Sequence, residues 1–135
     1  MNTSLTIEIY WLIATLLMTS LFWLPYILNR MLEQGIVNAL WDPLGDTRTE
    51  KPWANRMMQA HNNAVENLVI FAPLAILVQI TGTNSTMTAN ACMIYFISRL
   101  LHYSAFTFAI PLLRVITFLC GFGAQLTLGI SLLSA

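Results

Sequence analysis

The sequence has few charged residues, since only 9% of its 135 residues are Asp, Glu, Lys or Arg, whereas 57% are hydrophobic. A soluble domain carries about 25% charged residues. Six basic and six acidic residues also cancel, so the chain has no positive field that would attract nucleic acid. The composition therefore excludes an ordinary soluble domain and a nucleic-acid-binding protein. It predicts one membrane domain over residues 1–135.

Cysteine is also scarce, and the motifs of metal and nucleotide chemistry are missing. Cys92 and Cys120 both lie in apolar stretches, where a cysteine usually packs as a small hydrophobic residue. The sequence contains no CxxC or HExxH motif, no glycine-rich phosphate loop and no Ser/His/Asp set. No metal site and no nucleotide site is predicted.

Four apolar stretches are present instead, and each is long enough to be a membrane-spanning helix. About 20 helical residues cross about 30 Å of hydrocarbon. The expected helices cover residues 5–29, 55–80, 87–108 and 111–133, with a kink at Pro25. Short turns between the last three make them antiparallel neighbours. The predicted fold is an all-α integral membrane protein with an antiparallel four-helix transmembrane bundle.

The first connection, from Arg30 to about Ala54, is long and polar, and it is expected to face water with a short helix over residues 31–40. Basic residues concentrate beside this loop and at the third connection, and the positive-inside rule therefore places both in the cytoplasm. The basic residues concerned are Arg30, Arg48, Lys51, Arg56 and Arg114.

Two groups of polar residues lie inside the apolar helices. In the second expected helix, one arc of about 100° holds a polar set, whereas His61 points to nearly the opposite side. In the third, four residues at i, i+3, i+4 and i+7 share a face. The first set is Arg56, Gln59, Asn63, Glu66 and Asn67, and the second is Arg99, His102, Tyr103 and Phe106.

Glu66 and Arg99 lie deep in their helices, and a lone buried charge carries a large penalty. We expect them to meet, directly or through a bound zwitterion, in one water-accessible cleft. Arg114 begins the fourth helix and either reaches the membrane surface or points inward. Two structural alternatives stay open: Gln59, Asn62 and Asn67 as interhelical hydrogen-bond partners only, and His102 as a packed histidine.

Two motifs carry a family resemblance that covers essentially the whole chain. The run Ala60-His61-Asn62-Asn63-Ala64-Val65-Glu66-Asn67 has the pattern Ala-His-x-Asn-x-x-Glu-Asn. Arg99-x-x-His102 follows, and then residues 110–114, Ile-Pro-Leu-Leu-Arg. These motifs resemble the MAPEG family, the membrane-associated proteins in eicosanoid and glutathione metabolism. The run over residues 60–68 is similar to that of bacterial members, so the expected location is a bacterial inner membrane.

The resemblance implies a homotrimer that binds glutathione as a co-substrate between neighbouring subunits, near the cytoplasmic face. It implies that Arg114 stabilises the glutathione thiolate. Asn63 and Glu66 match positions that hold the peptide backbone and amino group, and Arg99 and His102 match contacts from the third helix. Arg30 matches an arginine that approaches from the adjacent subunit.

Some positions differ from the family pattern. Gln59 stands where well-studied members have arginine, and Arg56, one turn earlier, is a candidate substitute for it. Phe106 replaces a tyrosine that contacts ligand, and Tyr103 offers a phenol beside it. Val115 follows Arg114 where one eicosanoid-making branch has serine, so prostaglandin synthesis is not expected.

The predicted function is a membrane-bound glutathione transferase or peroxidase, which acts on apolar electrophiles or lipid hydroperoxides through an arginine-stabilised thiolate. Its partners would be glutathione, an apolar lipid-like substrate and membrane lipids. Two alternatives stay open. One is a non-enzymatic lipid-binding scaffold of the same family, and the other is a small proton-coupled multidrug exporter that uses Glu66.

Overall fold

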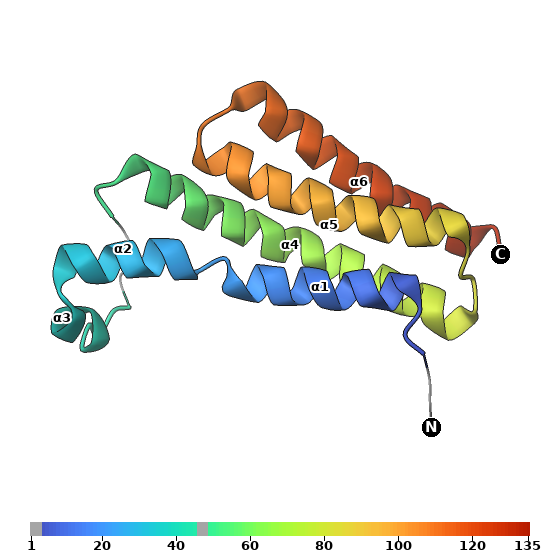
Figure 1. The fold of residues 1–135 in the computed structure, drawn as a ribbon, viewed down its shortest axis with the longest axis horizontal. Coiled ribbons are helices and arrows are strands. Elements are labelled where there is room, and N and C mark those ends of the chain that lie inside the picture. Colours follow the sequence, from blue (N-terminus) through green and yellow to red (C-terminus); the bar gives the residue numbers. More distant parts are fainter. Residues whose placement is uncertain (1–3, 46–48) are drawn as a thin grey trace.

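A computed structural model describes residues 4–45 and 49–135, and every regular element in that part of the chain is a helix. The predicted all-helical fold is therefore confirmed there. The long helices lie lengthwise beside one another (Figure 1), and α5 packs against α1, α4 and α6. The helices are α1 (Ile7–Leu21), α2 (Leu24–Gln34), α3 (Ile36–Leu40), α4 (Pro52–Thr81), α5 (Thr86–Thr107) and α6 (Pro111–Leu133).

The first expected helix is divided into two. α1 ends at Leu21 and α2 begins at Leu24, with Pro25 in its first turn. The proline ring has no N–H to donate, which accounts for a break at this point. The chain then stays helical as far as Gln34, beyond the expected end at residue 29. As a result, α2 and α3 project past one end of the bundle (Figure 1).

Three spans are long and apolar enough to cross a membrane: Ile7–Gln34, Pro52–Thr81 and Pro111–Leu133. Helix α5 has 22 residues but is not among them. Its polar side chains, Arg99 and His102 among them, lower its hydropathy. This helix is also the one that packs against α1, α4 and α6.

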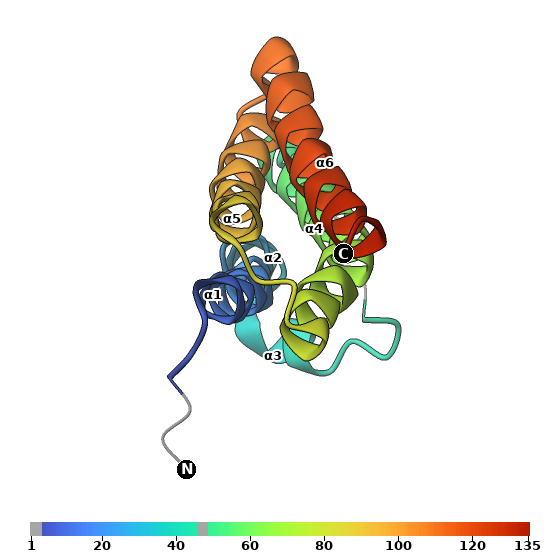
Figure 2. The ribbon, with the colours of Figure 1, turned by 90° about the vertical axis from the view of Figure 1, so that its right-hand side faces the viewer.

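The turns explain why neighbouring helices run antiparallel. α4 ends at Thr81 and is capped by Gly82, whose φ of +68° lies in the left-handed region that glycine adopts without steric cost. Ser85 then caps α5 through a capping box with Thr88. Seen along the bundle, α5 and α4 lie on either side of this turn (Figure 2). The turn lies at the same end of the bundle as the start of α1 and the end of α6 (Figure 1).

Close packing of α5 against α6 depends on Gly121. A Cβ atom there would lie 3.1 Å from the Ser98 Oγ atom, so only glycine allows this approach without a shift. Further into the core, the rings of Phe71 and Tyr95 stack with their centroids 3.8 Å apart. Both residues are fully buried. Two other glycines of α6, Gly123 and Gly129, face open space in a single copy of the chain.

At the N-terminus of α5, a buried carboxylate joins this helix to α1. Glu8 is only 3% exposed, and the Thr88 hydroxyl donates a hydrogen bond to it. A negative charge near a helix N-terminus is stabilised by the helix dipole and by the free N–H groups there. Glu8 therefore links α1 to the first turn of α5.

We expect Glu8→Leu to lower the free energy of unfolding by about 1–3 kcal/mol, because the buried Thr88 hydroxyl loses its charged acceptor and keeps only the Ser85 carbonyl oxygen. Glu8→Gln keeps an acceptor oxygen and should lose less. Thermal unfolding of the detergent-solubilised protein measures both, with Glu50→Gln in the exposed loop as the matched control. An unchanged unfolding midpoint in Glu8→Leu would contradict this account.

Candidate functional site

A groove of 210 Å³ lies between α4, α5 and α6 and brings together residues from both sequence motifs. Asn63 enters from α4, His102 from α5 and Arg114 from the first turn of α6. The groove therefore combines an amide, an imidazole and a guanidinium with apolar walls. Its lining consists of Asn63, His102, Phe106, Arg114, Val115, Phe118 and Leu119.

Arg114 is exposed, and its guanidinium lies over the ring of Phe106, with 5.0 Å between the Cζ atom and the ring centroid. This is cation–π distance. Phe106 therefore holds the Arg114 guanidinium at the wall of the groove. Because the guanidinium stays accessible, a molecule in the groove can reach its N–H donors.

His102 holds the backbone of Arg114. Its Nδ1 atom lies 3.0 Å from the Arg114 carbonyl oxygen. A carbonyl only accepts, so Nδ1 carries the hydrogen and donates it. His102 is 3% exposed, and its Nε2 atom has no hydrogen-bond partner within the described residues. One ring nitrogen therefore joins α5 to α6, and the other is buried without a partner in the described part of the chain.

Arg99 bonds Asn63 rather than Glu66. Its Nη2 atom donates to the Asn63 Oδ1 atom at 2.7 Å, and the side chain is only 2% exposed. Glu66 lies on the exposed face of α4. The expected direct contact between Glu66 and Arg99 is thus replaced by a contact one helical turn earlier on α4. The alternative, that the two meet through a bound zwitterion, stays a prediction.

Tyr103 faces away from the groove, toward the break between α1 and α2. Its hydroxyl donates to the Phe22 carbonyl oxygen at 2.9 Å, and its ring stacks on that of Phe22 at 3.8 Å. Nearby, the Tyr26 hydroxyl lies 2.7 Å from His61 Nδ1. The expectation that His61 belongs to a different face therefore agrees with its contacts. Together these side chains stabilise the break in the helix.

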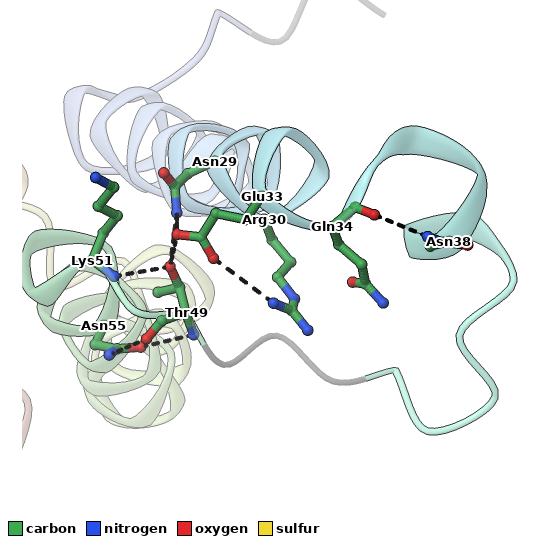
Figure 3. A network of polar contacts seen from close by, with 8 residues as sticks. All are labelled: Asn29, Arg30, Glu33, Gln34, Asn38, Thr49, Lys51 and Asn55. Carbon is green, nitrogen blue, oxygen red and sulfur yellow. Dashed lines mark hydrogen bonds and ion pairs between the residues drawn. The ribbon is translucent and has the colours of Figure 1, made fainter.

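The remaining predicted site residues do not line the groove. The Nε atom of Arg56 donates to the Thr107 carbonyl oxygen at 2.9 Å and so ties the start of α4 to the end of α5. Gln59 is exposed on α4. On α2, the Nη1 atom of Arg30 lies 3.7 Å from the Oε2 atom of Glu33, in a polar network at the loop (Figure 3). Within a single copy of the chain, Arg30 does not line the groove.

Two buried polar residues were not predicted from the sequence, Tyr95 on α5 and Gln125 on α6. Tyr95 is 1% exposed, and its hydroxyl has no hydrogen-bond partner within the described residues. Gln125 donates from its Nε2 atom to the Asn67 carbonyl oxygen at 3.0 Å. The spacing of Tyr95, Arg99 and His102, at i, i+4 and i+7, continues the polar face by one turn and could have revealed Tyr95.

The fold and groove define a helical membrane protein with a cationic site between its helices, and comparison with known families agrees. The sequence model of the MAPEG family matches residues 9–134. The chain therefore belongs to the MAPEG family and is a membrane protein, which confirms the resemblance. Comparison with curated proteins and with solved structures gave no match. Among the described residues, no three His, Cys, Asp or Glu side chains are placed to hold a metal ion.

We expect Tyr103→Phe to lower the free energy of unfolding by about 1 kcal/mol, because the Phe22 carbonyl loses its donor. If glutathione binds in the groove, the same substitution should leave its affinity unchanged, since the hydroxyl is turned away from the groove. Thermal unfolding and calorimetric titration of the solubilised protein measure the two effects. A loss of affinity without a loss of stability would instead place the phenol in the binding site.

Proposed function

We propose that this protein is a membrane-bound glutathione transferase or peroxidase, in which Arg114 stabilises the thiolate of bound glutathione. The supporting observation is the accessible guanidinium that Phe106 and the His102 contact hold at the groove wall. Membership of the MAPEG family supports glutathione-related chemistry at the level of the family.

The chemistry requires a cation close to the sulfur. A free thiol has a pKa of about 8.5 and is mostly protonated at neutral pH, whereas the thiolate is the nucleophile. A guanidinium stays charged and lowers the pKa of a thiol within hydrogen-bond reach. A shift of about two units corresponds to about 2.7 kcal/mol in favour of the thiolate. The apolar walls strengthen this interaction, because they exclude water.

The polar groups around Arg114 suit the rest of the tripeptide. Asn63 and His102 line the groove beside it. Glu66 and Gln59 lie on the exposed face of the same helix as Asn63, where a carboxylate can take up the ammonium of a zwitterion. Arg56 and Tyr103 already have backbone partners, and so they contribute to the proposed site mainly by fixing the helices.

The size of the groove favours a homo-oligomer. Ligand pockets usually measure roughly 300–1,000 Å³, and the groove in one copy measures 210 Å³. A neighbouring subunit of the proposed homotrimer would complete it and bring Arg30 toward the exposed residues of α4. In this arrangement four membrane-spanning segments place the first and third loops, and hence the site, on the cytoplasmic side of a bacterial inner membrane.

The second substrate is proposed to come from the bilayer. Around Arg114, α6 presents exposed apolar side chains, among them Leu112, Val115 and Leu119. An apolar electrophile or a lipid hydroperoxide can reach the sulfur along this surface without crossing water. The proposed reaction is therefore conjugation of the thiolate to an electrophile or reduction of a hydroperoxide by it.

We expect Arg114→Ala to lower kcat/KM for glutathione conjugation to 1-chloro-2,4-dinitrobenzene by about 100-fold, the factor that about two pKa units of the bound thiol represent. Arg114→Lys keeps the charge and should lose less. Both substitutions leave in place the backbone carbonyl that accepts a hydrogen bond from His102, so the fold is expected to persist. The ultraviolet absorbance of bound thiolate gives a second, direct readout.

Lys51→Ala is the matched control, because Lys51 is an exposed cation at the loop, away from the groove. Equal rates for Arg114→Ala and Lys51→Ala would remove Arg114 from catalysis. If the unsubstituted protein binds lipid but neither binds nor turns over glutathione, the result would favour the non-enzymatic scaffold over the enzyme.

A further inference from the structure

A pocket of about 560 Å³ lies between the first turns of α1 and α5. The start of α1 and the turn before α5 lie at one end of the bundle, whereas α6, with Arg114 in its first turn, begins at the other end (Figure 1). This pocket is therefore separate from the groove around Arg114. Its volume is within the range of roughly 300–1,000 Å³ that is usual for small-molecule sites. Its lining combines one carboxylate, Glu8, and one indole, Trp11, with neutral polar side chains such as Thr86 and Asn90.

Glu8 is the only charged residue in the lining, and it is only 3% exposed. The groups that contact its carboxylate are hydrogen-bond donors without charge: the Thr88 hydroxyl, the Asn84 side chain and backbone N–H groups. In the described part of the chain no basic side chain lies within ion-pair distance of it. The N-terminus of α5 carries only about half a positive charge, whereas buried charges in proteins are usually paired. The carboxylate therefore lacks a full counter-charge, and a cation in the pocket would supply it.

The rest of the lining favours an organic cation over a metal ion. A metal ion such as Ca²⁺ takes about six or more oxygen ligands, whereas this lining offers a single carboxylate beside an indole. Tyr10 and Phe96 both contact the Trp11 ring, and each ring centroid lies 5.2 Å from that of Trp11. An indole attracts an ammonium group through its π face, and the side-chain oxygens of Thr86 and Asn90 can accept hydrogen bonds from the N–H groups of an amine.

We propose that this pocket binds an organic ammonium group, with Glu8 as its counter-ion and Trp11 as its aromatic contact. The ammonium group belongs either to a lipid headgroup or to a free amine, since both present the same chemistry to the pocket. Trp11 lies in the second turn of α1, and aromatic side chains near the ends of membrane helices meet the lipid headgroups. Both kinds of ligand therefore reach this depth. The site does not depend on the proposed glutathione chemistry, because it lies at the opposite end of the bundle.

The first test follows thermal unfolding of the protein in a neutral maltoside detergent as ethanolamine hydrochloride or choline chloride is added. Binding to the folded state raises the unfolding midpoint with ligand concentration, which gives an apparent dissociation constant. Glu8→Gln removes the charge and keeps the shape, and it should weaken binding at least about tenfold. Each variant is compared with its own ligand-free midpoint, so a change in basal stability does not affect the result. Glu50→Gln removes a carboxylate from the exposed loop and should bind like the unsubstituted protein.

The second test distinguishes a lipid headgroup from a free amine. Dioctanoyl phosphatidylethanolamine is compared with its N-acetyl derivative, which keeps the phosphate and the acyl chains but has no positive charge. If the ligand is a lipid headgroup, the first lipid should raise the midpoint at concentrations at least about tenfold lower than ethanolamine does. If it is a free amine, ethanolamine should act at the same concentrations as the lipid. In both cases Glu8→Gln should remove the difference between the two lipids.

Trp11→Leu should weaken binding of the ammonium probes about fivefold, whereas Trp11→Phe keeps a π face and should lose less. Four results would overturn the proposal. They are no rise in midpoint with any ammonium probe, an equal rise in the unsubstituted protein and in Glu8→Gln, the same rise with sodium chloride at equal concentration, and equal stabilisation by the two lipids. The last result would show that the pocket holds acyl chains alone. None of these measurements involves glutathione, so their failure leaves the proposed function unaffected.

Discussion

The polar side chains of α5 need partners that hydrocarbon cannot supply, and the arrangement of the helices depends on this constraint. An unsatisfied polar group in the bilayer interior costs several kcal/mol. Arg99 bonds to α4, His102 to the backbone of α6, and Tyr103 to the backbone at the α1–α2 break. Three residues of one helical turn thus reach three different neighbours. A helix with such contacts has to lie between the others, where α5 is found.

The same contacts also form the groove, so the hydrogen bonds that hold the helices together are the ones that position the site. The bond from His102 that joins α5 to α6 also fixes the backbone of Arg114. The bond from Arg99 that joins α5 to α4 also fixes the amide of Asn63. Rigid elements position a site more accurately than loops do. Here each groove residue lies on a helix, and hydrogen bonds from α5 hold the Asn63 side chain and the Arg114 backbone.

The sequence predicted the long helices, apart from the break in the first, because helical periodicity is a local pattern. Of the residues that it singled out, four line the groove: Asn63, His102, Phe106 and Arg114. It did not predict their partners. Spacing places Arg99, His102 and Tyr103 on one face, but it does not reveal that three helices surround that face. Charge alone paired Arg99 with Glu66, whereas helix geometry brings Asn63 within reach. The exact break at Phe22–Trp23 depends on contacts with Tyr103, which lies far away in the sequence.

Glu66 is the residue that most favours the proposed homo-oligomer. It lies halfway along α4, a helix long and apolar enough to cross a membrane, and its side chain is exposed. A carboxylate that faced hydrocarbon at this depth would carry a large free-energy cost. Either water or a second subunit has to cover that face of α4. A neighbour that closes the groove there would also enclose Glu66, and the ammonium of a bound zwitterion would then be its natural counter-ion.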